Sequence, residues 1–335
     1  MPHPSIIAKL IKIETSFIIR YTCSTMKPLI SIIMPAYNAD SHLDFSISSV
    51  LNQTYTEWEL IIINDGSTDS TADILNKWSQ KDNRIRHFHQ KNSGVSAARN
   101  FALELVQGEY ITMIDADDAL SPDALDLMYQ AMTTNECVDM VSVGFCEVSS
   151  TGQVTHRGGL LMGRTDSGLF QVEDGFLAEY HHCSIWGKLL RTNIIRKFSL
   201  LFNTNLKIAE DHIFSLQYLQ HCRKTVVLQQ ELYHYMQWED SAMSRFEQAV
   251  LPDTVYTDCA IQYCELATHC NRPWAVALLS HFFRTTLWVK RIITTHRSHD
   301  WPKIRNRIYG RLPSLCVRAG IIGSLRMIKR WYFTR

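Results

Sequence analysis

Apolar and polar positions alternate in a regular way between residues 28 and 115. Short continuous apolar runs predict buried strands, and the segments between them carry apolar residues at helical spacing. Strands are predicted over 28–37, 60–63, 84–90 and 109–115, with helices over 41–53, through Ile74, Leu75 and Trp78, and over 94–106. Strands that alternate with helices at this interval predict an α/β domain with a mostly parallel sheet and helices on both faces. Ligands of such sheets bind at the carboxyl ends of the strands.

Three carboxylates follow the last of these strands directly, in the stretch YITMIDADDAL. An Asp-x-Asp pair at a strand end places Asp115 and Asp117 on the same side of the chain. Oxygen ligands of this kind suit Mg²⁺ or Mn²⁺, which complete their coordination with water and substrate phosphate oxygens. A Ca²⁺-binding EF-hand loop is excluded because Leu120 stands where that loop needs glycine. Capping of the following helix remains an alternative for Asp118 or Ser121.

The composition is that of a globular protein. The chain has 335 residues, of which 46% are hydrophobic, enough for one large α/β domain with an appendage or for two modest domains. Nine cysteines without a CxxC pair or a secretory cleavage pattern indicate a reducing cytoplasm rather than a disulfide scaffold. The cysteines and histidine within 259–270 match no zinc-site spacing, so packed thiols are the preferred interpretation.

Charge is distributed unevenly along the chain. Residues 290–335 contain twelve Lys/Arg and one acid, so they carry +11, whereas residues 1–289 carry −10. Aromatic and aliphatic residues interleave with these cations, which favours an anionic membrane surface over RNA as the partner, and no nucleic-acid partner is predicted. No apolar run reaches the roughly 18 residues that a membrane span requires. The predicted location is cytoplasmic and peripheral, on the inner face of the cytoplasmic membrane.

The first 27 residues read as an N-terminal extension. Ile-rich patches alternate there with Lys9, Lys12 and Glu14, which is too charged for a signal sequence. An interfacial helix is one interpretation. Translation that begins at Met26 is the other, because the organised pattern starts only at residue 28.

Several segments stand in order on consecutive strand–helix units. They are PAYN (35–38), NDGSTD (64–69), NSGVSAARN (92–100) and the DADD turn (115–118), followed by SIWGKLLR (184–191), IAEDHIF (208–214) and LYHYMQWEDSAM (232–243). Together they resemble the family 2 glycosyltransferases, over residues 28 to about 245. The resemblance implies a GT-A fold with a Rossmann-like nucleotide-binding sheet. It divides 28–245 into a nucleotide-sugar half (28–120) and an acceptor half (121–245), followed by a helical, basic, membrane-proximal region (246–335).

The resemblance assigns the nucleotide site to strand ends. Ala36, Tyr37 and Asn38 would line the base pocket, although Tyr37 also reads as a packed rim aromatic. Asp65 would accept a hydrogen bond from the uracil ring N–H, because a carboxylate only accepts. The family more often has aspartate where this chain has Asn64.

The resemblance places the metal on the phosphate side of the site. It gives Asp117 to the metal directly and Asp115 to the ribose or a water-mediated metal contact, so Mn²⁺ or Mg²⁺ is the implied cofactor. The ion would neutralise charge that develops on the departing nucleoside diphosphate. Arg99 would lie close to ribose or phosphate oxygens, where a guanidinium fork suits them, and an exposed helix arginine is the alternative. Lys188 would contact the diphosphate or the acceptor.

The acceptor side carries the implied base. Inverting transfer needs a group that takes the proton of the acceptor hydroxyl. The resemblance assigns this role to Asp211, with Glu210 orienting it or holding an acceptor hydroxyl. Acids in a first helical turn are also favoured by the helix dipole without any catalysis. Trp186 would offer a sugar an apolar platform, and His234 would be an extra metal or phosphate ligand.

These assignments imply an inverting, metal-dependent glycosyltransferase. It would move a hexose from UDP-glucose, UDP-galactose or an N-acetyl derivative to a saccharide or undecaprenyl-diphosphate-linked acceptor, in O-antigen, lipopolysaccharide core or capsule synthesis. A nucleotidyltransferase is the first alternative, but it would want a Gly-rich, basic phosphate loop after its first strand, and MPAYNAD is not one. A noncatalytic nucleotide-sugar or membrane-binding protein is the second, and it would tolerate loss of Asp211.

Overall fold

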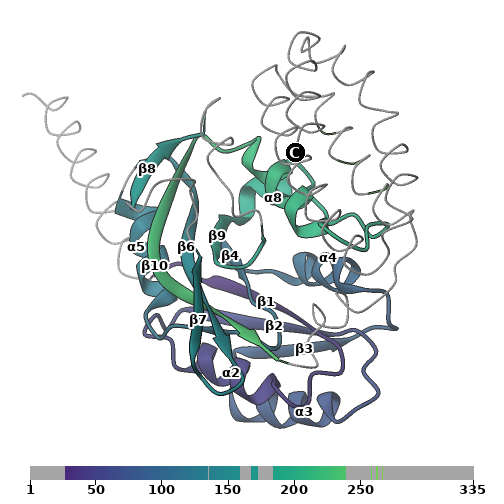
Figure 1. Ribbon diagram of the computed structural model, residues 1–335. Coiled ribbons are helices and arrows are strands. Elements are labelled where there is room, and N and C mark those ends of the chain that lie inside the picture. Colours follow the sequence, from purple (N-terminus) through teal and green to yellow (C-terminus); the bar gives the residue numbers. More distant parts are fainter. Residues whose placement is uncertain are drawn as a thin grey trace, which may run out of the picture.

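A single mixed sheet organises the molecule. The computed structural model describes residues 27–134, 136–158, 167–172 and 184–238, together with the single residues 258, 262 and 266. Ten strands of this part of the chain form the sheet, in the order β3-β2-β1-β4-β9-β6-β10-β5, with β7 beside β6 and β8 beside β10 (Figure 1). The order reverses direction between β1 and β4, which is where doubly wound sheets bind their ligands.

The first half of the sheet is parallel, as the sequence predicts. Its strands are β1 (Ile30–Ala36), β2 (Trp58–Asn64), β3 (Ile85–His89) and β4 (Tyr110–Met113), joined by helices α2 (Leu43–Leu51), α3 (Thr71–Lys81) and α4 (Val95–Leu105). All three pairings among these strands are parallel. Figure 1 shows α4 on one face of these strands and α2 and α3 on the other. The order confirms the Rossmann-like half and the alternation expected of an α/β domain.

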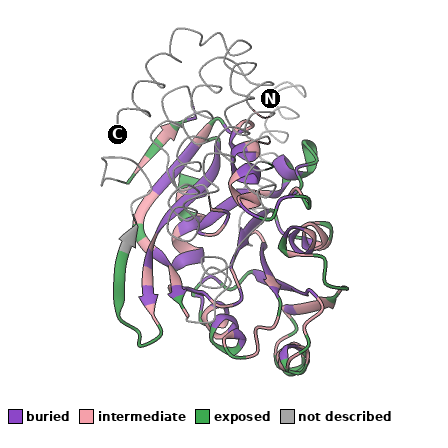
Figure 2. Cartoon of the chain, turned by 45° about the vertical axis from the view of Figure 1, so that its right-hand side comes forward, coloured by how far each residue is buried: buried purple, intermediate pink, exposed green. Residues whose placement is uncertain are grey.

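The core lies along the central strands. Every residue of β2 is buried, and so is every residue of β1 except Pro35. Figure 2 shows buried residues concentrated on the strands and exposed residues on the outer loops and helix faces. A strand covered on both faces is apolar at most positions, which explains the runs LISIIM and LIII. The buried polar residues Ser31 and Glu59 hydrogen-bond to each other at 2.6 Å. Each fully buried isoleucine contributes about 1.5–3 kcal/mol relative to an exposed one.

The second half of the sheet is mixed. Its elements are β5 (Ala119–Leu120), α5 (Ala124–Thr134), β6 (Val138–Ser149), β7 (Val154–Gly158), β8 (Gly168–Gln171), β9 (Lys188–Arg191), α7 (Thr192–Lys197), α8 (Glu210–Leu219) and β10 (Lys224–Gln237). β9 lies between β4 and β6, antiparallel to both, and β10 runs parallel to β6. The parallel order that the sequence predicts therefore belongs to the nucleotide half, and β9 joins it to the acceptor half.

The start of α5 differs from the expected cap. Neither Asp118 nor Ser121 caps this helix, because its first residue is Ala124 and the Asp118 carboxylate bonds to β10. The side-chain oxygen of Gln53 instead accepts the N–H of Leu125 at 3.0 Å. A residue more than seventy positions earlier in the chain therefore satisfies the first turn, which local capping rules do not consider.

Several sequence predictions fall on residues that the structure does not describe. The first 26 residues, the cysteine cluster within 259–270 and the basic tail over 290–335 lie outside the described part, apart from the single residues 262 and 266. Among the described residues, no helix has the length and apolar character needed to cross a bilayer.

Candidate active site

The three acids of the DADD turn have different surroundings. The turn follows β4, whose pairing with β1 is extended by the Ile114 N–H on the carbonyl of Ile33 at 3.0 Å. Asp115 and Asp117 are partly exposed, whereas Asp118 is buried. Burial raises the pKa of Asp118 well above its ordinary value, and repulsion from Asp117 and Asp115 raises it further. Two of the three carboxylates are therefore placed to meet a ligand, and the third is part of the interior.

Arg99 joins the turn to the acceptor half. Its side chain lies on α4, is 5% exposed, and donates to Asp115 Oδ1 and to Glu210 Oε1, each at 3.0 Å. Burial alone would lower the pKa of Arg99, but the neighbouring carboxylates Asp115, Glu210 and Asp211 raise it above its ordinary value. The Arg99 guanidinium thus connects Asp115 with Glu210, and Glu210 lies 111 residues after Arg99 in the sequence.

The Glu-Asp pair lies at the first turn of α8. The residue before it, Ala209, adopts a left-handed conformation with φ 59°, a strained state for alanine that turns the chain into the helix. Burial and then repulsion from Asp211 raise the pKa of Glu210, and Arg99 opposes both effects. Asp211 is half-buried, and its Oδ1 accepts the N–H of His212 at 2.8 Å. One oxygen of this carboxylate is therefore held by the start of the helix.

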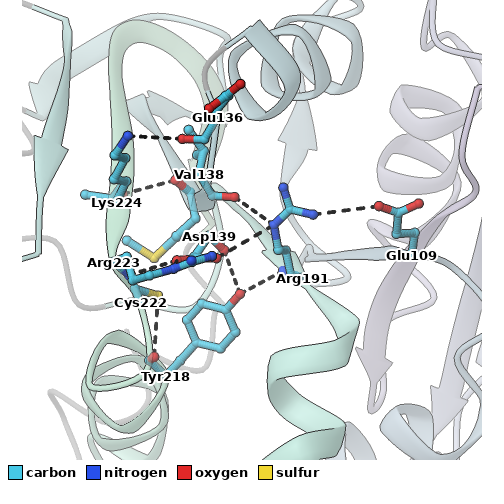
Figure 3. Close-up of polar contacts among 11 residues, drawn as sticks. Glu109, Glu136, Val138, Asp139, Arg191, Tyr218, Cys222, Arg223 and Lys224 are labelled. Atoms are coloured by element: carbon cyan, nitrogen blue, oxygen red, sulfur yellow. Dashed lines mark hydrogen bonds and ion pairs between the residues drawn. The ribbon is translucent and has the colours of Figure 1, made fainter.

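A buried tyrosine anchors α8 to the sheet (Figure 3). The hydroxyl of Tyr218 donates to the carbonyl of Asp139 on β6 and accepts the N–H of Arg191 on β9, both at 2.7 Å. The carboxylate of Asp139 in turn accepts the N–H of Arg223 at 2.8 Å, where β10 begins. These bonds fix the helix that carries Glu210 and Asp211 against three strands of the acceptor half.

The predicted base pocket is a set of loops at the ends of β1 and β2. Tyr37 is 49% exposed at this rim, while Ala36 is buried and its carbonyl accepts the N–H of Asp65 at 2.8 Å. Asn38 has φ 48° and its side-chain oxygen accepts the N–H of Thr68 at 2.9 Å. The loops after the two strands are thus joined by hydrogen bonds, and Tyr37 is left facing outward.

Asp65 has protein partners that the sequence did not suggest. Its carboxylate accepts the backbone N–H groups of Ser93 and Gly94, each at 2.8 Å, and the side-chain amide of Gln90 at 2.7 Å. A carboxylate offers about four lone-pair sites, so one remains for a base N–H. Gly66 makes the turn possible, since it has φ 73° and an added Cβ would come within 2.6 Å of the Asn92 nitrogen.

Two residues that were predicted to contact the donor, Lys188 and Arg99, bond to other residues of the protein. Lys188 on β9 is fully buried, and its amine donates to the carbonyl of Ser184. An amine held in the interior does not face a diphosphate, so the structure does not support that contact. Arg99 is buried between two carboxylates rather than exposed, which excludes the exposed-helix alternative and makes its first role the ion pairs described above.

Two aromatic residues of the acceptor half also pack internally. Trp186 stacks on Tyr233 with ring centroids 4.4 Å apart and meets the edge of Phe145, so its nearest partners are aromatic side chains of β10 and β6. The Nε2 atom of His234 lies 3.0 Å from the hydroxyl of Ser121. Burial lowers the pKa of His234.

The donor set fits a divalent cation that also binds substrate. Asp115, Asp117, Asp118, Glu210 and Asp211 are five carboxyl groups, and Arg99 is their cation partner in the ion pairs of this cluster. Within the described ranges, no group of three or more His, Cys, Asp or Glu side chains is placed to hold a metal ion by itself. Two partly exposed carboxylates in an excess of negative charge suit Mg²⁺ or Mn²⁺, which take only one or two protein carboxylates and complete their shell with substrate phosphates.

Comparison with known proteins finds similarity to glycosyltransferases over part of the chain. A model described as Glycosyl transferase family 2 matches residues 31–191. The uncharacterized glycosyltransferase EpsJ of Bacillus subtilis (strain 168) is 31% identical over 214 residues, which cover 63% of this chain and 61% of EpsJ. The chain therefore spans less than two thirds of that relative.

Solved structures confirm the fold at low sequence identity. The structure of S. aureus TarS 1–349 in complex with UDP-GlcNAc has a TM-score of 0.63 and 19% identity, covering 90% of this chain and 92% of that one. The mannosyltransferase PcManGT from Pyrobaculum calidifontis, in complex with GDP-Man and Mn²⁺, has a TM-score of 0.57 and 13% identity, covering 92% and 84%. The two neighbours bind different nucleotide sugars, so the shared GT-A fold does not by itself identify the donor.

Proposed function

We propose that the chain is an inverting, metal-dependent enzyme of the glycosyl transferase family 2 type, which transfers a hexose from a nucleotide sugar to a saccharide or lipid-linked acceptor. The observation that supports this best is the double ion pair of Arg99, which brings the Asp-x-Asp turn and the Glu-Asp pair of α8 to one place. A noncatalytic binding protein has no need of an acid pair at this distance from the donor turn.

Asp117 and Asp115 are the residues that would hold Mn²⁺ or Mg²⁺ together with the donor diphosphate. When bound, the ion supplies Lewis-acid stabilisation of the negative charge that develops on the leaving diphosphate. Arg99 keeps Asp115 in place from the interior, so that the carboxylate does not have to be ordered when the donor arrives. Asp115 remains 32% exposed in this arrangement, so it is accessible to ribose or to a metal-bound water.

Asp211 is proposed as the general base. As the acceptor oxygen attacks the anomeric carbon, its hydroxyl proton passes to Asp211, and the bond from that carbon to the diphosphate oxygen breaks on the opposite face. The N–H of His212 orients the carboxylate through Oδ1 and leaves Oδ2 to the hydroxyl. Glu210, bonded to Arg99, fixes the first turn of α8 beside it.

The nucleotide is proposed to lie over the ends of β1 and β2. Tyr37 is exposed at this rim and offers a flat apolar surface to a base. Asp65 retains one acceptor site beyond its three protein donors, which suits the ring N–H of uracil. Ala36 and Asn38 complete the floor. The preferred donors are UDP-glucose, UDP-galactose or an N-acetyl derivative, in line with the UDP-GlcNAc that TarS binds.

The pathway and location are also proposals. Surface-polysaccharide synthesis, of O-antigen, lipopolysaccharide core or capsule, is supported by the likeness to bacterial glycosyltransferases. An acceptor that is linked to undecaprenyl diphosphate would be presented at the inner face of the cytoplasmic membrane. The net charge of +11 on residues 290–335 supports binding to that anionic surface.

The test is donor turnover by the purified protein. Release of nucleoside diphosphate is measured from UDP-, GDP- and dTDP-sugars with Mn²⁺ and with EDTA, in the presence and absence of a lipid-diphosphate acceptor. The proposal expects release from one donor class, its loss in EDTA, and its loss in Asp117→Ala and Asp211→Asn. Asp123→Ala is the matched control, since this exposed acid precedes α5 and should not affect turnover. Intact donors under all conditions, with UDP still bound, would establish a noncatalytic binding protein.

A further inference from the structure

Residues at the end of β10 and just after it hydrogen-bond to the DADD turn. Tyr233 donates its hydroxyl to Asp118 Oδ2 at 2.5 Å, and the same hydroxyl accepts the N–H of Asp115 at 3.3 Å. The N–H of Met236 donates to Asp118 Oδ1 at 2.8 Å. The indole N–H of Trp238 donates to the carbonyl of Asp117 at 2.8 Å. We refer to Tyr233, Met236 and Trp238 as the β10 clasp.

The buried position of Asp118 excludes it from ligand contact. Asp118 is 1% exposed. Tyr233 is fully buried, and the ring of Trp186 stacks on it. An unpaired carboxylate in this position would cost several kcal/mol. Both carboxyl oxygens are instead used by the clasp, so β10 accounts for how this acid is accommodated in the interior.

The clasp acts on the backbone that carries the exposed acids. It bonds the N–H of Asp115 and the C=O of Asp117, which lie on either side of Ala116, and the adjoining β5 pairs with β10 through Leu120. The backbone of the turn is thus fixed at both aspartates. Both residues remain partly exposed, and the Asp115 carboxylate also bonds to the buried Arg99 at 3.0 Å.

We infer that Asp118 is a positioning residue that ties β10 of the acceptor half to the Asp-x-Asp turn, and that it acts on the metal and the donor only through Asp115 and Asp117. This inference rests on the proposed function, because it assigns to Asp118 an effect on a metal that Asp117 would hold. Ligand carboxylates depend on such supporting contacts, and loss of one typically costs about 10–100-fold in metal affinity or activity. A misplacement of about 1 Å has a comparable effect on rate.

The experiment measures metal-dependent UDP binding rather than activity alone. UDP is titrated into the full-length protein by calorimetry at a series of Mn²⁺ concentrations, which gives the half-saturating Mn²⁺ concentration. Tyr233→Phe removes the hydroxyl and keeps the ring on Trp186, and Asp118→Asn keeps one oxygen acceptor. Trp238→Phe removes the indole N–H together with part of the ring system, and it keeps one aromatic ring over His42. This third variant keeps the test available should Asp118→Asn fail to fold.

Tyr55→Phe is the matched control. It also loses a buried hydroxyl, which donates to the carbonyl of Pro28 at 2.6 Å, far along the chain from the turn. The expected result is an increase of about 10–100-fold in half-saturating Mn²⁺ for the three clasp variants, with Tyr55→Phe unchanged. In turnover assays the clasp variants should lose kcat and donor affinity while the KM for acceptor stays constant.

Two outcomes would overturn the inference, and they are distinguishable. If wild-type protein binds UDP with Mn²⁺ and the clasp variants bind as tightly, Asp118 stabilises only the fold. If wild-type protein itself shows no Mn²⁺-dependent UDP binding, the proposed function is rejected. The inference about Asp118 is then rejected as well, because it rests on that function.

Discussion

Replacing Arg99 with methionine tests the ion pairs at the centre of the site. Methionine keeps much of the apolar stem and removes the charge. Arg99 is 5% exposed and Glu210 14%, so their pair is buried, whereas Asp115 is 32% exposed. Removing one partner of a buried pair leaves an uncompensated charge and typically costs about 3–5 kcal/mol, against about 0.2–1 kcal/mol for an exposed pair. We therefore expect Arg99→Met to lower the free energy of unfolding by about 3–5 kcal/mol near pH 8, mainly because Glu210 is left without its partner.

The loss should depend on pH in a defined direction. The pKa of Glu210 is already raised in the folded protein by burial and by Asp211, and Arg99 is the group that lowers it. Without Arg99 the pKa rises further, so the folded variant binds the Glu210 proton more tightly than the unfolded chain does. A raised carboxyl pKa stabilises the fold below the unfolded value and loses that contribution as pH rises through the folded value. The deficit of Arg99→Met should accordingly shrink as pH falls from 8 towards 5.

The assay is urea unfolding followed by tryptophan fluorescence, with wild type and variant compared at each pH. Arg84→Met is the matched control, because Arg84 pairs with Asp82 at 2.7 Å with its side chain 35% exposed. Arg84→Met should lower the free energy of unfolding by about 0.2–1 kcal/mol. Its difference from wild type should not shrink as the pH falls. An Arg99→Met deficit below about 1 kcal/mol at pH 8, or one that stays the same at pH 5, would refute the reasoning.

Three further predictions concern single positions. Tyr218→Phe removes a buried hydroxyl that serves two backbone partners, so it should lower the free energy of unfolding by about 1–3 kcal/mol in urea titrations and reduce kcat without changing UDP affinity. Gly66→Ala forces a Cβ towards Asn92 at φ 73° and should weaken UDP binding in calorimetry, whereas Gly152→Ala, at φ 82° but in open space, should carry only the backbone strain and bind normally. Asp211→Asn should keep wild-type UDP affinity and lose measurable diphosphate release, and appreciable release would reject Asp211 as the base.

The nucleotide half could be predicted from the sequence because its signals are local. Strands β1 to β4 and helices α2 to α4 lie where apolar runs and helical spacing predicted them, within a few residues. The Asp-x-Asp turn follows β4 directly, so its place at the carboxyl edge needed no long-range information. Gly66, which follows Asp65, has φ 73° at the turn between β2 and α3.

The rest of the site depends on pairings between distant segments, which no local pattern encodes. Asp118 read as a helix cap because capping is a local rule, yet its partners lie on β10. Lys188 was predicted to contact the diphosphate or the acceptor because it stands in a family motif. It is buried because β9 runs between β4 and β6. Arg99 was predicted to contact the nucleotide, and its carboxylate partners come from two other elements.

The long sequence separation across the site has a consequence for its synthesis. Glu210 is synthesised 111 residues after its partner Arg99. Tyr233 is synthesised 115 residues after its partner Asp118. At about 5–20 residues per second, a ribosome needs roughly 6–23 s to make that interval. During this time the first half of the sheet has its strands, and Arg99 has Asp115, but both Glu210 and the clasp on the turn are missing. On the proposed function, a nascent chain should not bind a donor productively until β10 has emerged, and any chaperone that attends it should engage the unpaired edge of β4.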